Sequence, residues 1–172
     1  MRNFWVLILL LIFACNQEQT KVKPKEKDWS KGHSVSYNKE INEREQLSIA
    51  LYLEHHKELK VTTTSTGLRF AKIKVNPKGN LGTPGKIASV ILKITLIDGT
   101  PCYETDSSYY DEIPIDHNDK ESGLNEGLKM LRTGEKAKMI LPNHLAHGLI
   151  GDLGKIPPLA IILVDVELVE LR

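Results

Sequence analysis

The residues best suited to chemistry are His144 and His147, three positions apart, with Asp152 shortly after them. A histidine ring can donate or accept a hydrogen bond, or it can bind a metal ion. A zinc site needs a third protein ligand at a suitable spacing, and the sequence offers none here, so we expect no metal. One interpretation of His147 is an exposed histidine of a turn.

Two carboxylates, Glu104 and Asp106, follow Tyr103 closely in the sequence. We expect both carboxylates to be solvated rather than to act as acid–base catalysts. Cys102 is interpreted as a half-buried strand residue, because no basic neighbour is evident that would make its thiol reactive.

The second cysteine, Cys15, ends an N-terminal segment with a short positive start and an apolar run over 4–13. Spanning a bilayer takes about 20 apolar residues, so the run has the length of a signal-peptide core instead. The stretch from Leu11 to Cys15 resembles the lipobox of bacterial lipoproteins. That resemblance implies a signal peptide over 1–14 and lipid on Cys15; the alternative is ordinary secretion with a free cysteine.

Composition narrows the class of partner. Hydrophobic residues make up 41% of the chain and charged residues 26%, as is typical of a globular domain. The chain has 23 basic and 22 acidic residues, and the two become equal once Arg2 of the signal peptide is removed. This neutral balance argues against nucleic acid as the main partner and leaves the substrate open.

The remaining sequence predicts a tether, a helix and a sheet. Residues 15–37 are too polar to fold and are expected to form a flexible tether. A helix is predicted over 38–59, where Asn42 and Glu45 have the spacing of a capping box. The periodicity then predicts strands within 60–75 and over 88–97, 136–141 and 160–171, and a short helix over 122–131. This order indicates an α+β domain over 60–172, an antiparallel sheet with one helix packed across it.

Several motifs in that domain occur together and in a fixed order. The segment from Gly123 to Pro142 resembles the central helix and following strand of the FKBP-type peptidyl-prolyl cis-trans isomerases. The chain is also similar to this family at Leu145–Gly148, Gly151, Gly154, Ile156–Pro158, Leu163–Leu168 and Asp98–Gly99. The resemblance covers 62–172 and implies a curved FKBP-like sheet. With the anchor and the N-terminal helix, the chain resembles the gliding-motility-associated FKBP lipoproteins of Bacteroidetes.

The resemblance also implies a site in which aromatic walls make a dry pocket and hydrogen-bond donors orient the ligand. It assigns catalytic roles to Tyr103, Glu104, His147 and Ile156, with Asp106 as the alternative to Glu104. It assigns the substrate pocket to Leu92, Glu121, Leu124 and Val164. Four of the family's aromatic residues are replaced in this chain. Leu92 and His147 stand where the family has tyrosines, Leu124 stands where it has the tryptophan of the pocket floor, and Val164 stands where it has a phenylalanine. The predicted pocket is therefore largely aliphatic.

These features predict a prolyl isomerase without a cofactor, acting on proline-containing segments of exported proteins. We expect a monomer held by its lipid anchor in the bacterial cell envelope, at the periplasmic face of the outer membrane, since Asn16 is not an Asp-type retention signal. One alternative is a binding module that has lost efficient catalysis and docks an envelope assembly partner. Another is a chaperone that dimerises through the N-terminal helix.

Overall fold

The computed structural model describes residues 31–106, 108–117 and 121–172. The predicted signal peptide, Cys15 and most of the predicted tether lie outside these residues. The chain divides into two compact units, Met1–Tyr37 and Asn38–Arg172. Of the first unit the structure describes only the start of a helix, and all other elements belong to the second.

The described elements are two α-helices, seven strands and one turn of 3-10 helix. In chain order they are α2 (Lys31–His55), β1 (Thr62–Thr63), β2 (Arg69–Lys74), β3 (Ile87–Leu96), β4 (Pro101–Glu104), β5 (Asp111–Pro114), α3 (Ser122–Leu128), β6 (Lys136–Leu141), η1 (Asn143–Leu145) and β7 (Ile162–Leu171).

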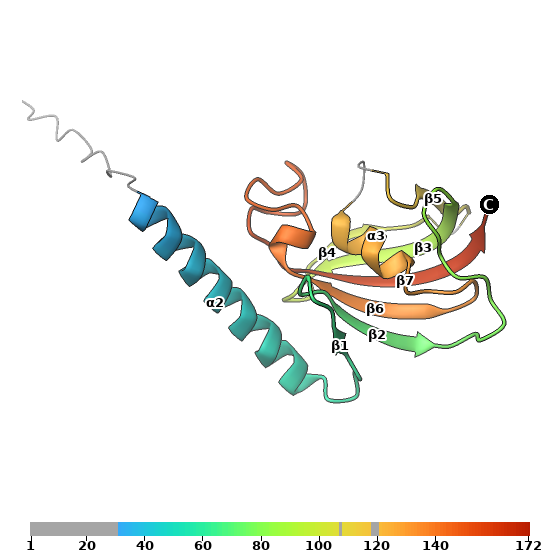
Figure 1. The fold of residues 1–172 in the computed structure, drawn as a ribbon, viewed down its shortest axis with the longest axis horizontal. Helices are drawn as coiled ribbons and strands as arrows, with labels where there is room; N and C mark the ends of the chain where they lie inside the picture. The colour runs from blue at the N-terminus through green and yellow to red at the C-terminus, as the bar shows by residue number, and fades with distance from the viewer. Residues whose placement is uncertain (1–30, 107, 118–120) are drawn as a thin grey trace, which may run out of the picture. The chain divides into compact units, whose positions relative to one another are not determined.

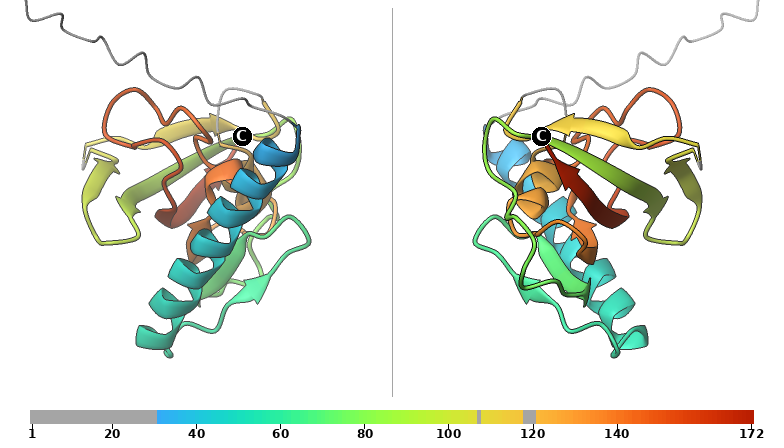
Figure 2. Two further views of the ribbon diagram at one scale, coloured as in Figure 1. Left: turned by 90° about the vertical axis from the view of Figure 1, so that its left-hand side faces the viewer. Right: turned by 90° about the vertical axis from the view of Figure 1, so that its right-hand side faces the viewer.

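The strands form one antiparallel sheet in the order β1-β2-β6-β7-β3-β4, and β5 pairs with the first half of β3. The long strands β3 and β7 pair along nearly their whole length in the middle of the sheet. Figure 1 shows α3 lying across these strands, and Figure 2 shows β1 and β2 on one side of the sheet with the yellow strands β4 and β5 on the other. The predicted α+β class, with an antiparallel sheet and a short helix across it, is confirmed.

The main core lies between α3 and the inner face of the sheet. Side chains alternate along a strand, so Phe70, Met139, Val164 and Ile94 lie in register across four strands and point inward. Leu124 and Leu128 of α3 complete this core.

Two glycines let α3 approach β6 closely. A Cβ atom on Gly127 would lie 2.3 Å from the sulfur of Met139, and one on Gly123 would lie 2.8 Å from Cγ of Leu141. Such overlaps cannot be accommodated in a closely packed interior without moving the helix. The Gly-x-x-x-Gly spacing of Gly123 and Gly127 therefore has a packing cause.

A second, smaller core covers the outer face of the sheet. Ile49 of α2 is 1% exposed and packs with Ile140 of β6 and with Ile161 and Leu163 beside it. Ile140 faces outward because its neighbour Met139 faces inward. At this end the sheet is therefore buried on both faces.

Several predicted boundaries differ from the structure. The N-terminal helix begins at Lys31 rather than residue 38 and ends at His55 rather than residue 59. The capping-box prediction is wrong, because Asn42 and Glu45 lie inside the helix. The carboxylate of Glu45 instead accepts hydrogen bonds from N and Nδ2 of Asn143, at 2.6 and 2.8 Å.

The short helix also ends earlier than expected, at Leu128 instead of residue 131. The N–H groups of Met130 and Leu131 bond to carbonyls three residues earlier, on Gly127 and Leu128. The last turn is thus tightened, although Leu131 remains fully buried in the core.

Candidate functional site

A cavity of about 340 Å³ opens between strands β3 to β5, the start of α3 and the loop after η1. This volume lies at the lower end of the range of about 300–1,000 Å³ that ligand pockets occupy. Its floor is apolar and consists of Leu92 and Ile94 of β3 and Ile113 of β5. Leu92 and Ile94 are two positions apart on one strand, which puts both on the inner face.

Three residues predicted to form the pocket or act in it lie deeper than expected. Leu124, Ile156 and Val164 are 1–2% exposed and belong to the core that contains the floor residues. None of the three lines the cavity. They belong to the core next to the floor, and Val164 is paired directly with Ile94 across β7 and β3, so the two side chains lie side by side on the inner face.

Tyr103 of β4 forms one wall of the cavity, and its hydroxyl is already engaged. It donates a hydrogen bond to Oδ2 of Asp152, while Oδ1 of Asp152 accepts bonds of 2.8 Å from the backbone N–H groups of Gly154 and Ile156. Asp152 therefore fastens the loop after η1 to the edge strand β4. The family resemblance assigned the hydroxyl of Tyr103 and the backbone N–H of Ile156 as donors to a ligand. In the structure both groups donate to Asp152 instead.

This network fixes the charge of Asp152. The hydrogen bond from Tyr103, helped by the N–H groups of Ile156 and Gly154, lowers the pKa of the Asp152 carboxyl to about 2. The same bond raises the pKa of the Tyr103 hydroxyl. Asp152 is thus a carboxylate at neutral pH, and the sequence predicted no role for it in such a network.

His147 and Glu121 also line the cavity. The Nε2 atom of His147 lies 2.8 Å from Oε1 of Glu121, and the two side chains are 24% and 13% exposed. The ring N–H does not point at this oxygen, so Nε2 is buried without an aligned hydrogen bond to any described residue. Glu121 immediately precedes α3 and does not cap the helix with its side chain, which leaves its carboxylate facing His147.

Glu104 and Asp111 complete the rim of the cavity. Glu104 is 67% exposed and lies 3.7 Å from Nζ of Lys93. Asp111 accepts a hydrogen bond from Oγ1 of Thr105, which in turn accepts one of 2.7 Å from the backbone of Leu92. Of the two residues considered for the family's acidic position, Glu104 lines the cavity. Asp106 instead accepts a hydrogen bond from the backbone N–H of Ser108 in an exposed turn.

The other candidate residues are separate from this site. Nε2 of His144 is 2.9 Å from the carbonyl oxygen of Thr66. His144 therefore contacts the backbone outside the cavity, whereas His147 lines the cavity. Cys102 is buried, and burial is the main cause that raises the pKa of its thiol. Among the described residues no group of three or more His, Cys, Asp or Glu side chains is arranged to hold a metal ion. Within the same residues, no helix combines the length and the apolar character needed to cross a bilayer.

The structure thus defines an α+β domain with an apolar-floored cavity whose edge carries polar side chains. Residues 79–169 match the family model described as FKBP-type peptidyl-prolyl cis-trans isomerase, which spans more than half of the chain. The chain belongs to this family, as its motifs predicted.

Two curated relatives and two solved structures are similar to the chain. It is 32% identical over 162 residues to the FKBP-type isomerase FkpA of Buchnera aphidicola (subspecies Schizaphis graminum), covering 91% of this chain and 62% of the relative. It is 36% identical over 118 residues to FkpA of Escherichia coli K12, covering 67% of this chain and 42% of the relative. The chain thus spans less than two thirds of the length of either relative.

The crystal structure of E. coli FkpA matches with a TM-score of 0.64 and 29% identity, over 81% of this chain and 64% of the other. An isomerase structure from Pseudomonas syringae matches with a TM-score of 0.67 over 78% of this chain and 95% of the other. Its identity is 18%, so it shows the shared fold alone.

Proposed function

We propose that the chain is a peptidyl-prolyl cis-trans isomerase that acts on X–Pro bonds of exported proteins. Rotation about a peptide bond is opposed by a barrier of about 18–20 kcal/mol, because resonance gives the bond partial double character. The planar amide is more polar than the twisted one, so an apolar cavity destabilises the planar form relative to the twisted form. The reaction breaks no covalent bond, and the mechanism requires no cofactor.

The observation that carries this proposal is the buried Nε2 of His147 above the apolar floor. A buried polar atom without an aligned partner costs about 1–3 kcal/mol, and the carbonyl oxygen of a bound peptide would remove that cost. The hydroxyl of Tyr103 and the N–H of Ile156 are unsuited to this task, because Asp152 already accepts from both. His147 holds the carbonyl side of the X–Pro bond while the prolyl ring, seated on Leu92 and Ile94, turns.

Exchange NMR on a short X–Pro peptide tests the proposal, with and without the protein. We expect the cis–trans exchange rate to rise above the uncatalysed rate, and kcat/KM to fall about tenfold in His147→Ala, because one hydrogen bond to the ligand is lost. His144→Ala is the matched control, since its Nε2 bonds Thr66 instead of lining the cavity. An exchange rate equal to the uncatalysed one rejects the activity.

A catalytically weak binding module is the second candidate. It is favoured by the aliphatic floor, which offers a prolyl ring less aromatic surface than a tryptophan would. Both tryptophans, Trp5 and Trp29, lie outside the matched domain. Peptide-induced shifts of the cavity resonances without any rate enhancement would select this candidate over the enzyme.

The membrane anchor forms a separate part of the proposal. Lipid on Cys15 would hold the domain in the cell envelope as a monomer, and two acyl chains suffice for stable anchoring. The support is the lipobox-like segment Leu11–Cys15, together with Asn16 for the outer membrane. Mass spectrometry of the mature N-terminus, compared with Cys15→Ser, tests the lipid; membrane fractionation tests the location, and light scattering of the detergent-solubilised protein tests the monomer.

The narrower grouping with the gliding-motility-associated FKBP lipoproteins of Bacteroidetes rests on the same anchor and on the helix that precedes the domain. An unlipidated mature N-terminus would contradict that grouping and leave the isomerase proposal unaffected.

A further inference from the structure

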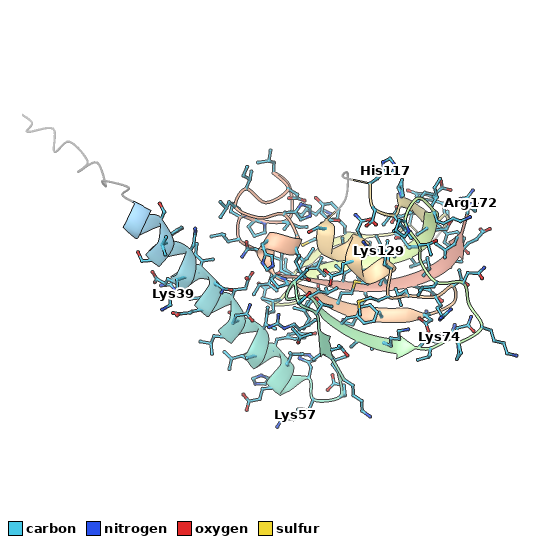
Figure 3. The ribbon with its side chains drawn as sticks, viewed as in Figure 1. Lys39, Lys57, Lys74, His117, Lys129 and Arg172 are labelled. Carbon is cyan, nitrogen blue, oxygen red and sulfur yellow. The ribbon has the colours of Figure 1, made fainter. Side chains whose placement is uncertain are left out.

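The apolar cavity has an unusually acidic rim. Four of its lining residues are carboxylic acids: Glu104, Asp111, Glu121 and Asp152. Among the described lining residues there is no lysine or arginine, and His147 is the only basic side chain. None of the lysines and arginines labelled in Figure 3 lines the cavity: Lys39, Lys57, Lys74, Lys129 and Arg172.

Protein cations offset this charge only in part. Lys93 lies near Glu104, but that pair is 50% and 67% exposed, so water screens it strongly. Lys155 lies with Nζ 5.2 Å from the centre of the Tyr103 ring, on the loop beside Asp152. Asp111 has a hydroxyl partner and no ion pair among the described residues. The mouth of the cavity therefore has a negative potential, and a low-dielectric cleft concentrates it.

We propose that this cavity selects X–Pro segments that carry a lysine or arginine next to the proline. The prolyl ring occupies the apolar floor, and the neighbouring basic side chain extends to the rim, where Asp111 meets its charge. The cavity binds the prolyl ring, and the carboxylates at its rim favour peptides with a positive charge next to the proline. This inference rests on the proposed function, because it names the substrate class of the same site.

The test compares peptides Ala-X-Pro-Ala, blocked at both ends, in which X is lysine, norleucine or glutamate. Norleucine has the length of lysine without its charge, so the lysine-to-norleucine ratio isolates electrostatics. With the purified protein at low salt we expect kcat/KM to be about threefold to tenfold higher for lysine than for norleucine, and lowest for glutamate. The ratio should approach one in about 1 M salt, where the screening length is about 3 Å.

Two variants localise the effect. Asp111→Asn removes a charge from the rim but keeps an acceptor for Thr105, so the ratio should fall by about half. Glu112→Gln is the matched control. Glu112 follows Asp111 in β5, so its side chain lies on the opposite face of the strand, where it pairs with Arg172. Removing its charge should therefore leave the lysine-to-norleucine ratio unchanged.

A lysine-to-norleucine ratio of one at low salt, with turnover of both peptides, overturns the inference and leaves the isomerase intact. If the peptides bind without turnover, the same ratio of dissociation constants decides the inference, while the enzymatic proposal fails. If no peptide binds or reacts, both proposals fail.

Discussion

Glu45 of α2 connects the N-terminal helix to the turn that carries His147. Its side chain is part of a residue only 6% exposed, and Oε1 accepts hydrogen bonds of 2.6 and 2.8 Å from N and Nδ2 of Asn143. Asn143 begins η1, and its own carbonyl accepts bonds from the N–H groups of Ala146 and Gly148, which flank His147. Glu45 therefore holds the start of a turn whose end lies in the cavity wall.

Replacing Glu45 by alanine leaves two donors on Asn143 without their acceptor. Hydrogen bonds to a charged group contribute about 1.5–3 kcal/mol each, but Asn143 is half-buried and water can satisfy part of the loss. We therefore expect Glu45→Ala to lower the free energy of unfolding by about 2–4 kcal/mol. Glu45→Gln keeps one acceptor oxygen and should cost about 1 kcal/mol.

Urea unfolding followed by circular dichroism measures these changes, and exchange NMR on an X–Pro peptide measures the effect on the site. Glu43→Ala is the control on the same helix, because its carboxylate is 67% exposed and makes only a 3.7 Å pair with Lys39. Its stability should change by no more than about 0.5 kcal/mol. If Glu45→Ala destabilises no more than Glu43→Ala, the helix does not support the turn, and the reasoning is refuted.

Three further predictions concern the loop, the second core and the glycines. The pKa of Asp152 is lowered to about 2 in the folded state, against about 3.9 in the unfolded state, so its contribution to stability is fully present above the unfolded value and is lost as pH falls through the folded value. The urea midpoints of wild type and Asp152→Asn should therefore differ at pH 6, approach each other below about pH 4, and converge only at about pH 2 or below. Ile49→Ala should cost about 2–4 kcal/mol in urea unfolding, whereas Leu47→Ala, at a position 61% exposed, should cost less than about 0.5; equal losses would contradict the packing of α2 on the sheet. Gly151→Ala places a Cβ 2.3 Å from the Ile156 carbonyl and should lower the thermal midpoint far more than Gly148→Ala, which has a similar positive φ but open space, and for which about 1–2 kcal/mol is expected.

The fold class could be predicted from the sequence, because the local signals of the long strands agree with the tertiary structure, whereas the short strands β4 and β5 were not predicted. Strand β6 has the predicted bounds, and β3 differs from its predicted range by a single position at each end. Gly123 and Gly127 lie in the segment that resembles the central helix of the family, and the structure supplies the packing reason for both glycines. Periodicity succeeds here because one face of each strand meets the main core.

The site was less predictable, because its details depend on contacts between distant segments. Asp152 is held by Tyr103, which is 49 positions away, and no local pattern signals such a bond. Glu45 had the spacing of a capping residue, yet its partner Asn143 is 98 positions away. A position matched to the family likewise does not fix whether a residue lines the cavity: Val164 was assigned to the pocket, but it is buried beside the floor residue Ile94 and does not line the cavity.

The residues that line the cavity belong to parts of the sheet that are supported to different extents. The His147 turn leaves β6 directly after Leu141, at the end of the sheet where α2 and the main core cover both faces. Tyr103 belongs to the short edge strand β4, which pairs only with β3, and Asp152 to an irregular loop. The His147 side of the cavity is therefore supported by packing on both faces of the sheet, whereas the Tyr103 side is supported by one neighbouring strand and by the hydrogen bond to Asp152.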